Sequence, residues 1–157
     1  MTATEKAVID KATLTRESRQ RQETRHASRR KEILEAAAAE FAETGYERAT
    51  LDRIGSRVGL TKASLYYYVD GKEQLLEQLL AQVVADIEQR AAGLTGPDAS
   101  PVARLHAFAT AHLITGTTRP AGKILAENLT VLTASPAAAE LMHRHETSVA
   151  TILQEGI

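Results

Sequence analysis

Apolar residues recur at three- and four-residue steps through most of the chain, which is the spacing of one face of an α-helix. The first such face lies within residues 28–44, and its members are Ile33, Leu34, Ala37, Ala38 and Phe41. Later faces lie within residues 70–92, 101–116, 120–132 and 136–153. No alternation of apolar and polar residues is long enough to predict a strand. The pattern therefore predicts an all-α protein.

Two short helices are expected between the first and second long ones. Thr50 is a natural N-cap for a helix that turns Leu51, Ile54 and Val58 inward. Gly59 follows, where a left-handed backbone costs little. Thr61 is then the expected cap of the next helix, with Leu65 as its buried residue. The sequence thus predicts a helix, a tight turn and a second helix.

Further end signals delimit the remaining helices. Asp70 and Glu73 have the spacing of a capping box, so we expect a long helix to begin at Asp70. The serine–proline pairs at 100–101 and 135–136 predict two more starts, and a helix from Pro120 is expected to run through Leu132. Gly45 and Gly116 are expected to end the helices that precede them.

Composition narrows the class of protein. The chain has 157 residues, of which 43% are hydrophobic, and no cysteine, which excludes disulfides and thiolate chemistry and fits a cytoplasmic protein. No apolar run approaches the roughly 20 residues that cross a bilayer, so no membrane partner is expected. Net charge is −1, but residues 16–31 carry +5. Residues 1–27 read as a basic polar leader, either a flexible solvated tail or a phosphate-binding segment, and the two readings are compatible.

The helix–turn–helix spacing is typical of DNA recognition, because the major groove admits one α-helix. Residues 61–68 would be the recognition helix, with Lys62, Ser64 and Tyr67 facing outward. Phosphate contacts are expected from Thr50 and Lys72, and the basic segment adds Arg29 and Arg30. The alternative is a plain helical bundle with half-buried tyrosines.

Residues 29–80 resemble the N-terminal DNA-binding domain of the TetR family of bacterial transcriptional regulators. The resemblance rests on the segments ILEAAAAEFAETGYERAT and LDRIGSRVGLTKASLYYYVDGKEQLLEQLL. The residues that fall on the family pattern, in order, are Phe41, Gly45, Tyr46, Thr50, Ile54, Gly59, Leu65, Tyr66, Lys72 and Glu73.

The resemblance implies separate roles for these positions. Tyr66 and Lys72 would touch phosphates, as would Thr50 and Thr61 at their helix starts, while Lys62, Ser64 and Tyr67 would face base edges or the backbone. Three residues depart from the pattern. Gly55 replaces the usual alanine, which is expected to loosen its helix by about 1 kcal/mol. Val58 also replaces an alanine, and Val69 replaces a phenylalanine, which implies a smaller core.

The resemblance also implies a C-terminal helical domain that binds a small effector and forms a homodimer. Residues 75–157 would be this domain, after a DNA-binding domain at 28–74, and the long helix would join the two. Two further helices that normally build the dimer interface would begin where the sequence ends, so the chain is either truncated or dimerises unusually. The candidate effector-lining residues are Phe108, His112, Leu125, Asn128, Leu132, Met142 and His145. For each of them an ordinary core or surface role is the alternative, and the few aromatics favour an aliphatic or acyl ligand.

Metal binding and catalysis are not expected. His143 and His145 lie two residues apart and His106 and His112 six apart, and neither pair has the i, i+4 spacing of a helical metal site. No phosphate loop, nucleophile elbow or His–Glu metal signature is present, so neither an enzyme nor a cofactor is predicted. The prediction is a repressor that binds a palindromic operator as a dimer and is released by an effector. The alternative is a helical interaction module or co-regulator that does not bind DNA.

Overall fold

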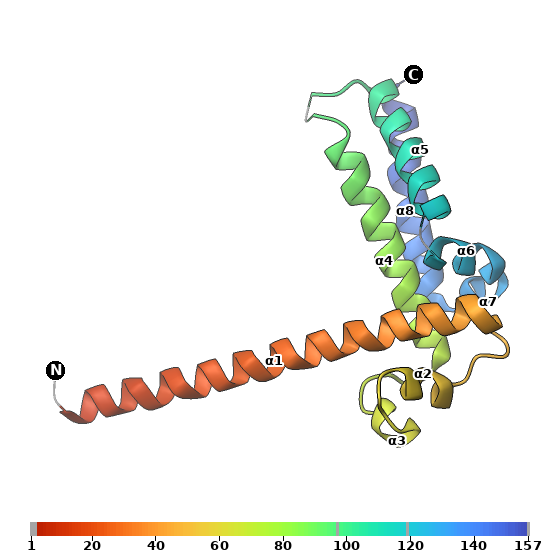
Figure 1. The fold of residues 1–157 in the computed structure, drawn as a ribbon. Coiled ribbons are helices and arrows are strands. Elements are labelled where there is room, and N and C mark those ends of the chain that lie inside the picture. The colour runs from red at the N-terminus through yellow and green to blue at the C-terminus, as the bar shows by residue number, and fades with distance from the viewer. Residues whose placement is uncertain (1–2, 97, 119, 157) are drawn as a thin grey trace.

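The computed structural model describes residues 3–96, 98–118 and 120–156, and every regular element among them is a helix, as predicted (Figure 1). In chain order the elements are α1 (Ala3–Thr44), α2 (Leu51–Arg57), α3 (Lys62–Leu65), α4 (Lys72–Gly93), α5 (Pro101–Thr118), α6 (Pro120–Glu127), α7 (Leu129–Ala134) and α8 (Pro136–Glu155). Helices α2 and α3 lie on one side of α1, and most of α4, with α5 and α8, lies on the other.

Helix α1 begins at Ala3, well before the start expected near residue 28. Its N-terminal half projects away from the other helices (Figure 1), and residues 16–25 are exposed. With no apolar face to bury, this half forms through local helix propensity and pairs such as Glu17–Arg21, whose charged atoms lie 3.8 Å apart. A polar leader therefore need not be an unstructured one.

The core of the N-terminal head forms where α1 meets α2 and α3. The predicted apolar face of α1 is confirmed, since Ile33, Ala37 and Phe41 are all buried. Ile54 of α2 and Leu65 of α3 are fully buried against this core. Because these side chains share one core, α3 is held in the head through α2 although it is only four residues long.

Glycines shape the two turns of the head. Gly45, after α1, has φ +79°, and Gly59, after α2, has φ +67°, so both adopt the left-handed backbone predicted for them. Gly55 has a different role from the one expected. A Cβ there would lie 2.7 Å from the Leu60 carbonyl oxygen, so the glycine permits the close return of the turn instead of merely loosening α2.

The predicted capping box at Asp70 and Glu73 is wrong. The N-cap of α4 is Gly71, which has no side chain to cap with. Asp70 instead pairs with Gln74: its backbone N–H donates to Gln74 Oε1 at 3.0 Å, and Gln74 Nε2 donates to Asp70 Oδ2 at 2.7 Å. The extended backbone at Gly71 places Asp70 one residue too early to cap the helix.

In the C-terminal body α4 packs against α5, α6, α7 and α8. The Ser135–Pro136 start is confirmed, because Ser135 Oγ accepts the Ala138 N–H at 3.2 Å. The helix expected from Pro120 to Leu132 is split, since Asn128 ends α6 by donating its side-chain amide to the Ile124 carbonyl at 2.7 Å.

Gly116 does not end α5, which continues to Thr118. A Cβ on Gly122 would lie 2.9 Å from the Gly116 Cα, so this pair of glycines lets α5 and α6 approach closely. The structural role of Gly116 is therefore packing, where a helix stop was expected.

Candidate functional site

Helix α3 is shorter than the recognition helix expected at residues 61–68, because the tyrosines lie in the turn that follows Leu65. The helix and this turn together present a polar and aromatic surface to solvent. Leu65 is fully buried beneath it, while Lys62 and Ser64 are exposed and Tyr66 and Tyr67 are 51% and 72% exposed. The predicted division of this segment into one inward leucine and several outward residues is confirmed. The exposed side chains could reach the edge of a groove without disturbing the core.

Threonine caps hold both short helices, as predicted. Thr50 Oγ1 accepts the Arg53 N–H at 3.3 Å at the start of α2. Thr61 Oγ1 accepts the Ser64 N–H at 3.1 Å at the start of α3, and the Ser64 hydroxyl lies 3.0 Å from it. Each cap satisfies an N–H group that the helix itself leaves free. Phosphate binding by these threonines stays a prediction.

Lys72 performs a structural task at the start of α4. Its Nζ donates to the backbone carbonyls of Tyr46 at 3.0 Å and Glu47 at 3.2 Å, and it lies 4.4 Å from the centre of the Tyr46 ring. These contacts tie the loop between α1 and α2 to α4. One of the three ammonium hydrogens remains for a phosphate.

Arg29 also has structural partners. Its Nη2 donates to the Val58 carbonyl at 2.6 Å, and its Nη1 pairs with Glu32 at 2.5 Å. The guanidinium thereby links α1 to the turn after α2. Arg30 is exposed and points its charge to solvent, so it is the freer of the two predicted phosphate contacts.

An aromatic contact that the sequence did not predict joins the projecting part of α1 to the turn that follows α3. The His26 ring lies 5.0 Å from the Tyr68 ring and 5.7 Å from the Tyr67 ring, and the two tyrosine rings are 5.0 Å apart. His26 precedes the apolar face of α1, so no periodicity pointed to it. The basic part of α1 therefore lies beside the exposed tyrosines.

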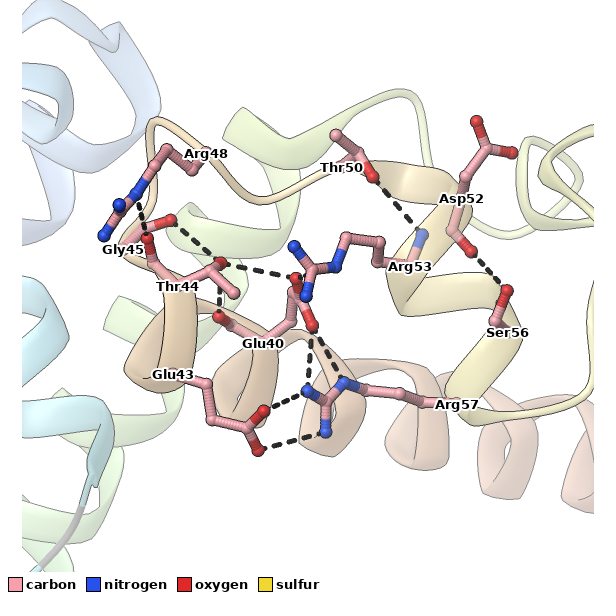
Figure 2. Close-up of polar contacts among 10 residues, drawn as sticks. All are labelled: Glu40, Glu43, Thr44, Gly45, Arg48, Thr50, Asp52, Arg53, Ser56 and Arg57. Carbon is pink, nitrogen blue, oxygen red and sulfur yellow. Dashed lines mark hydrogen bonds and ion pairs between the residues drawn. The ribbon is translucent and has the colours of Figure 1, made fainter.

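A buried carboxylate, also unpredicted, fixes α2 on α1 (Figure 2). The Glu40 side chain is 1% exposed. Its Oε1 lies 2.9 Å from Arg53 Nε, and its Oε2 accepts from Arg57 Nε at 3.0 Å. Arg57 continues to Glu43, with which its guanidinium makes two hydrogen bonds.

The charges of this cluster support one another. The hydrogen bond from Arg57 holds the pKa of Glu43 below its usual value, and Glu43 with Glu40 raises the pKa of Arg57. In the sequence, Glu40 does not fall on the predicted apolar face of α1, so it would be expected to lie exposed on the surface of the helix. Only the fold shows that two arginines from α2 cover it.

The C-terminal body contains a cavity of about 330 Å³ between α4, α5, α6, α7 and α8. Five of the seven predicted effector residues line it, namely His112, Leu125, Leu132, Met142 and His145. Much of the remaining wall is aliphatic and comes from α4, through Leu80, Val83, Val84 and Ile87. The structure thus brings most of the predicted set together, while their role as ligand contacts stays a proposal.

Two predicted residues lie outside this cavity lining. Asn128 uses its amide to end α6. Phe108 lines a separate hollow next to Ala91 and Ile152. Its ring nevertheless packs against both cavity histidines, with centroid distances of 5.1 Å to each.

The cavity histidines come from different helices and meet at one end of the cavity. His112 Nε2 of α5 lies 3.1 Å from His145 Nε2 of α8. His145 Nδ1 lies 3.5 Å from Glu88 Oε1 of α4. Spacing within one helix could not reveal this pair. In the part of the chain that the structure describes, no group of three metal-ligating side chains comes together.

A helix–turn–helix head with an exposed second helix, joined by one long helix to a helical body, is the architecture of a DNA-binding regulator. Residues 33–79 match the family described as bacterial regulatory proteins, tetR family. A solved structure of a transcriptional regulator of the TetR/AcrR family from Thermobifida fusca is 30% identical, with a TM-score of 0.60, and the match covers 81% of this chain and 67% of that one. The chain belongs to the TetR family.

Two further relatives have named roles. The HTH-type transcriptional repressor KstR2 of Mycobacterium tuberculosis is 36% identical over 78 residues, which is 50% of this chain and 39% of that protein. Its solved structure has a TM-score of 0.66 and 26% identity, covering 82% of this chain and 67% of its own. AibR, solved with isovaleryl coenzyme A and operator DNA, has a TM-score of 0.67 and 26% identity, with coverage of 82% and 69%. These relatives are regulators and not enzymes, in agreement with the sequence.

No helix within residues 3–96, 98–118 or 120–156 combines the length and the apolar character that crossing a bilayer requires.

Proposed function

We propose that this chain is a transcriptional repressor, acting in the cytoplasm, that binds a palindromic operator as a homodimer and leaves it when a small effector occupies the cavity. The observation that carries the proposal is α3: Leu65 anchors it, Thr61 caps it, Lys62 and Ser64 are exposed on it, and Tyr67 is exposed in the turn that follows. A buried anchor with exposed polar and aromatic neighbours suits a helix that enters the major groove.

The charge of α1 supports DNA as the partner. Residues 16–31 carry a net charge of +5 within one helix, and His26 holds this helix against the tyrosines that follow α3. Arginines beside the recognition helix would neutralise phosphates on the flanking backbone. Binding should therefore weaken steeply as salt concentration rises.

Helix α4 offers a route from the cavity to the head. Lys72, in its first turn, holds the loop before α2. Leu80 to Ile87, further along the same helix, form one wall of the cavity. A ligand that displaces α4 would move the head and change the distance between the two recognition helices, which must stay near one DNA turn, about 34–36 Å.

Exposed apolar residues on α5 support a homodimer. Val102 and Leu113 are 75% and 69% exposed. They lie three helical turns apart and hence on the same face. Isolated exposed residues of this size are common, but two in line suit a surface that a second copy covers.

The test uses duplex DNA selected by the protein from a random library. Changing Lys62 and Tyr67 to alanine should abolish selective binding, because both side chains are exposed and neither belongs to the buried core. Lys72 is a poorer choice, since its loss would also free the loop that it holds. Lys123→Ala is the matched control, because Lys123 is an exposed lysine on α6.

Two results would contradict the proposal. If the chain enriches no sequence at all, a co-regulator that does not bind DNA becomes the better account. If the double variant binds as the control does, α3 is not the reading helix.

A further inference from the structure

We propose that the cavity recognises an apolar alcohol, whose hydroxyl group bridges His112 and His145. This inference rests on the proposed function only in taking the cavity as the effector site. It names the chemical class of the effector, and it follows from the protons that the two histidines must carry.

The proton on His112 is fixed by its neighbour. His112 Nδ1 lies 3.2 Å from the Phe108 carbonyl oxygen, and a carbonyl can only accept. Nδ1 therefore carries the hydrogen, and in the neutral ring Nε2 is a bare acceptor. Because this acceptor lies 3.1 Å from His145 Nε2, that nitrogen is the donor, while His145 Nδ1 lies 3.5 Å from Glu88 Oε1 and needs a hydrogen of its own to face that carboxylate. The cavity thus ends in one acceptor and one donor that now satisfy each other.

A hydroxyl group matches this pair in both directions. Its hydrogen donates to His112 Nε2, and its oxygen accepts from His145 Nε2–H, so no proton has to be added or removed. Insertion requires the two nitrogens to separate to roughly 4.6 Å, the span of two hydrogen bonds at a bent oxygen. His112 stays bonded to Phe108, so His145 makes the movement.

Other oxygen groups fit less well. A ketone or ester accepts from His145 but has no hydrogen to donate to the exposed His112 ring, and the absence of that hydrogen bond costs up to about tenfold in affinity. A carboxylate only accepts hydrogen bonds, so it would need a hydrogen on His112 Nε2 in addition to the one on His145 Nε2. It would also meet like charge, since Glu146 lines the cavity and Glu88 lies behind His145.

The remaining lining residues and the cavity volume determine the polarity and size of the rest of the ligand. Apart from the histidines and Glu146, the lining residues are aliphatic, methionine or glycine. A cavity of about 330 Å³ is at the small end of ligand sites. An unbranched or compact hydrocarbon with a single hydroxyl group matches both the apolar lining and the small volume of the cavity.

The experiment measures binding of three probes of equal chain length, 1-decanol, 2-decanone and decanoate, to the full chain by titration calorimetry. We expect 1-decanol to bind about tenfold more tightly than 2-decanone, and decanoate to bind weakest. His112→Phe should remove the advantage of the alcohol and leave the affinity for the ketone unchanged, which also shows that the variant is folded. His145→Phe should weaken both.

His143→Phe is the matched control, because His143 is an exposed histidine of α8 outside the cavity lining, and it should bind all three probes as the wild type does. Decanoate binding as tightly as 1-decanol, or an alcohol preference that survives His112→Phe, would overturn the inference. Binding of selected DNA is measured separately without ligand. Intact DNA binding with no alcohol preference rejects the ligand class alone, while absent DNA binding rejects the proposed function alone.

Discussion

Glu40→Gln tests the cluster that holds α2 on α1. The substitution keeps the size of the side chain but removes its charge and turns an amide towards two guanidinium groups. Glu40 is 1% exposed and makes contacts of 2.9 Å to Arg53 and 3.0 Å to Arg57. A hydrogen bond to a charged group contributes about 1.5–3 kcal/mol.

The two contacts do not count equally. Arg53 is 58% exposed, so water recovers most of its lost interaction. The loss of the charged contact to Arg57 therefore accounts for most of the effect. We expect the free energy of unfolding to fall by about 2 kcal/mol. For a chain of this size, that lowers the melting temperature by about 4–8 °C.

Thermal unfolding followed by circular dichroism measures the effect. Glu43→Gln is the matched control, because it removes a carboxylate from the same Arg57 at an exposed position, and it should shift the melting temperature much less. A Glu40→Gln midpoint within about 1 °C of the wild type would refute the view that the buried carboxylate fixes α2.

Three further substitutions test single features of the head. Gly55→Ala should lower the melting temperature, although alanine favours helices by about 1 kcal/mol, because its Cβ would meet the Leu60 carbonyl at 2.7 Å; a rise would contradict the close approach. Tyr46→Phe should leave stability unchanged or increase it, since the Tyr46 hydroxyl is buried without a hydrogen-bond partner, and a clear loss in urea unfolding would argue against this. Burial raises the pKa of Tyr46 to about 12, so its neutral form persists in an absorbance titration, and the free energy of unfolding should be independent of this group below pH 10 and fall as pH rises towards 12. Arg57 lowers the pKa of Glu43, so that carboxylate stabilises the fold above its unfolded pKa near 4.5 and stops doing so as pH falls through the lower folded value; Glu43→Gln should flatten this limb of the stability–pH curve.

The features that sequence could predict are those that depend on neighbouring residues. The turn at Gly59, the cap at Thr61 and the buried Leu65 each follow from a few adjacent positions, and all three are confirmed. The all-α class follows from helical periodicity in the same way, whereas the candidates for the cavity followed from the resemblance to the TetR family.

What the sequence did not predict depends on partners far along the chain. Glu40 looks exposed until Arg57, seventeen residues on, covers it. The His112–His145 contact spans thirty-three residues, whereas the metal test considered only spacing within one helix. Asp70 was a local prediction that failed, because Gly71 moved the helix start past it.

The most direct test of the central claim is the affinity of the chain for DNA selected from a random duplex library, measured against salt concentration with and without the change of Lys62 and Tyr67 to alanine. We expect the wild type to enrich a palindromic sequence and to bind it with a steep salt dependence, and the double variant to lose this binding while Lys123→Ala keeps it. Equal binding by the double variant and the wild type would contradict the assignment of α3 as the helix that reads DNA.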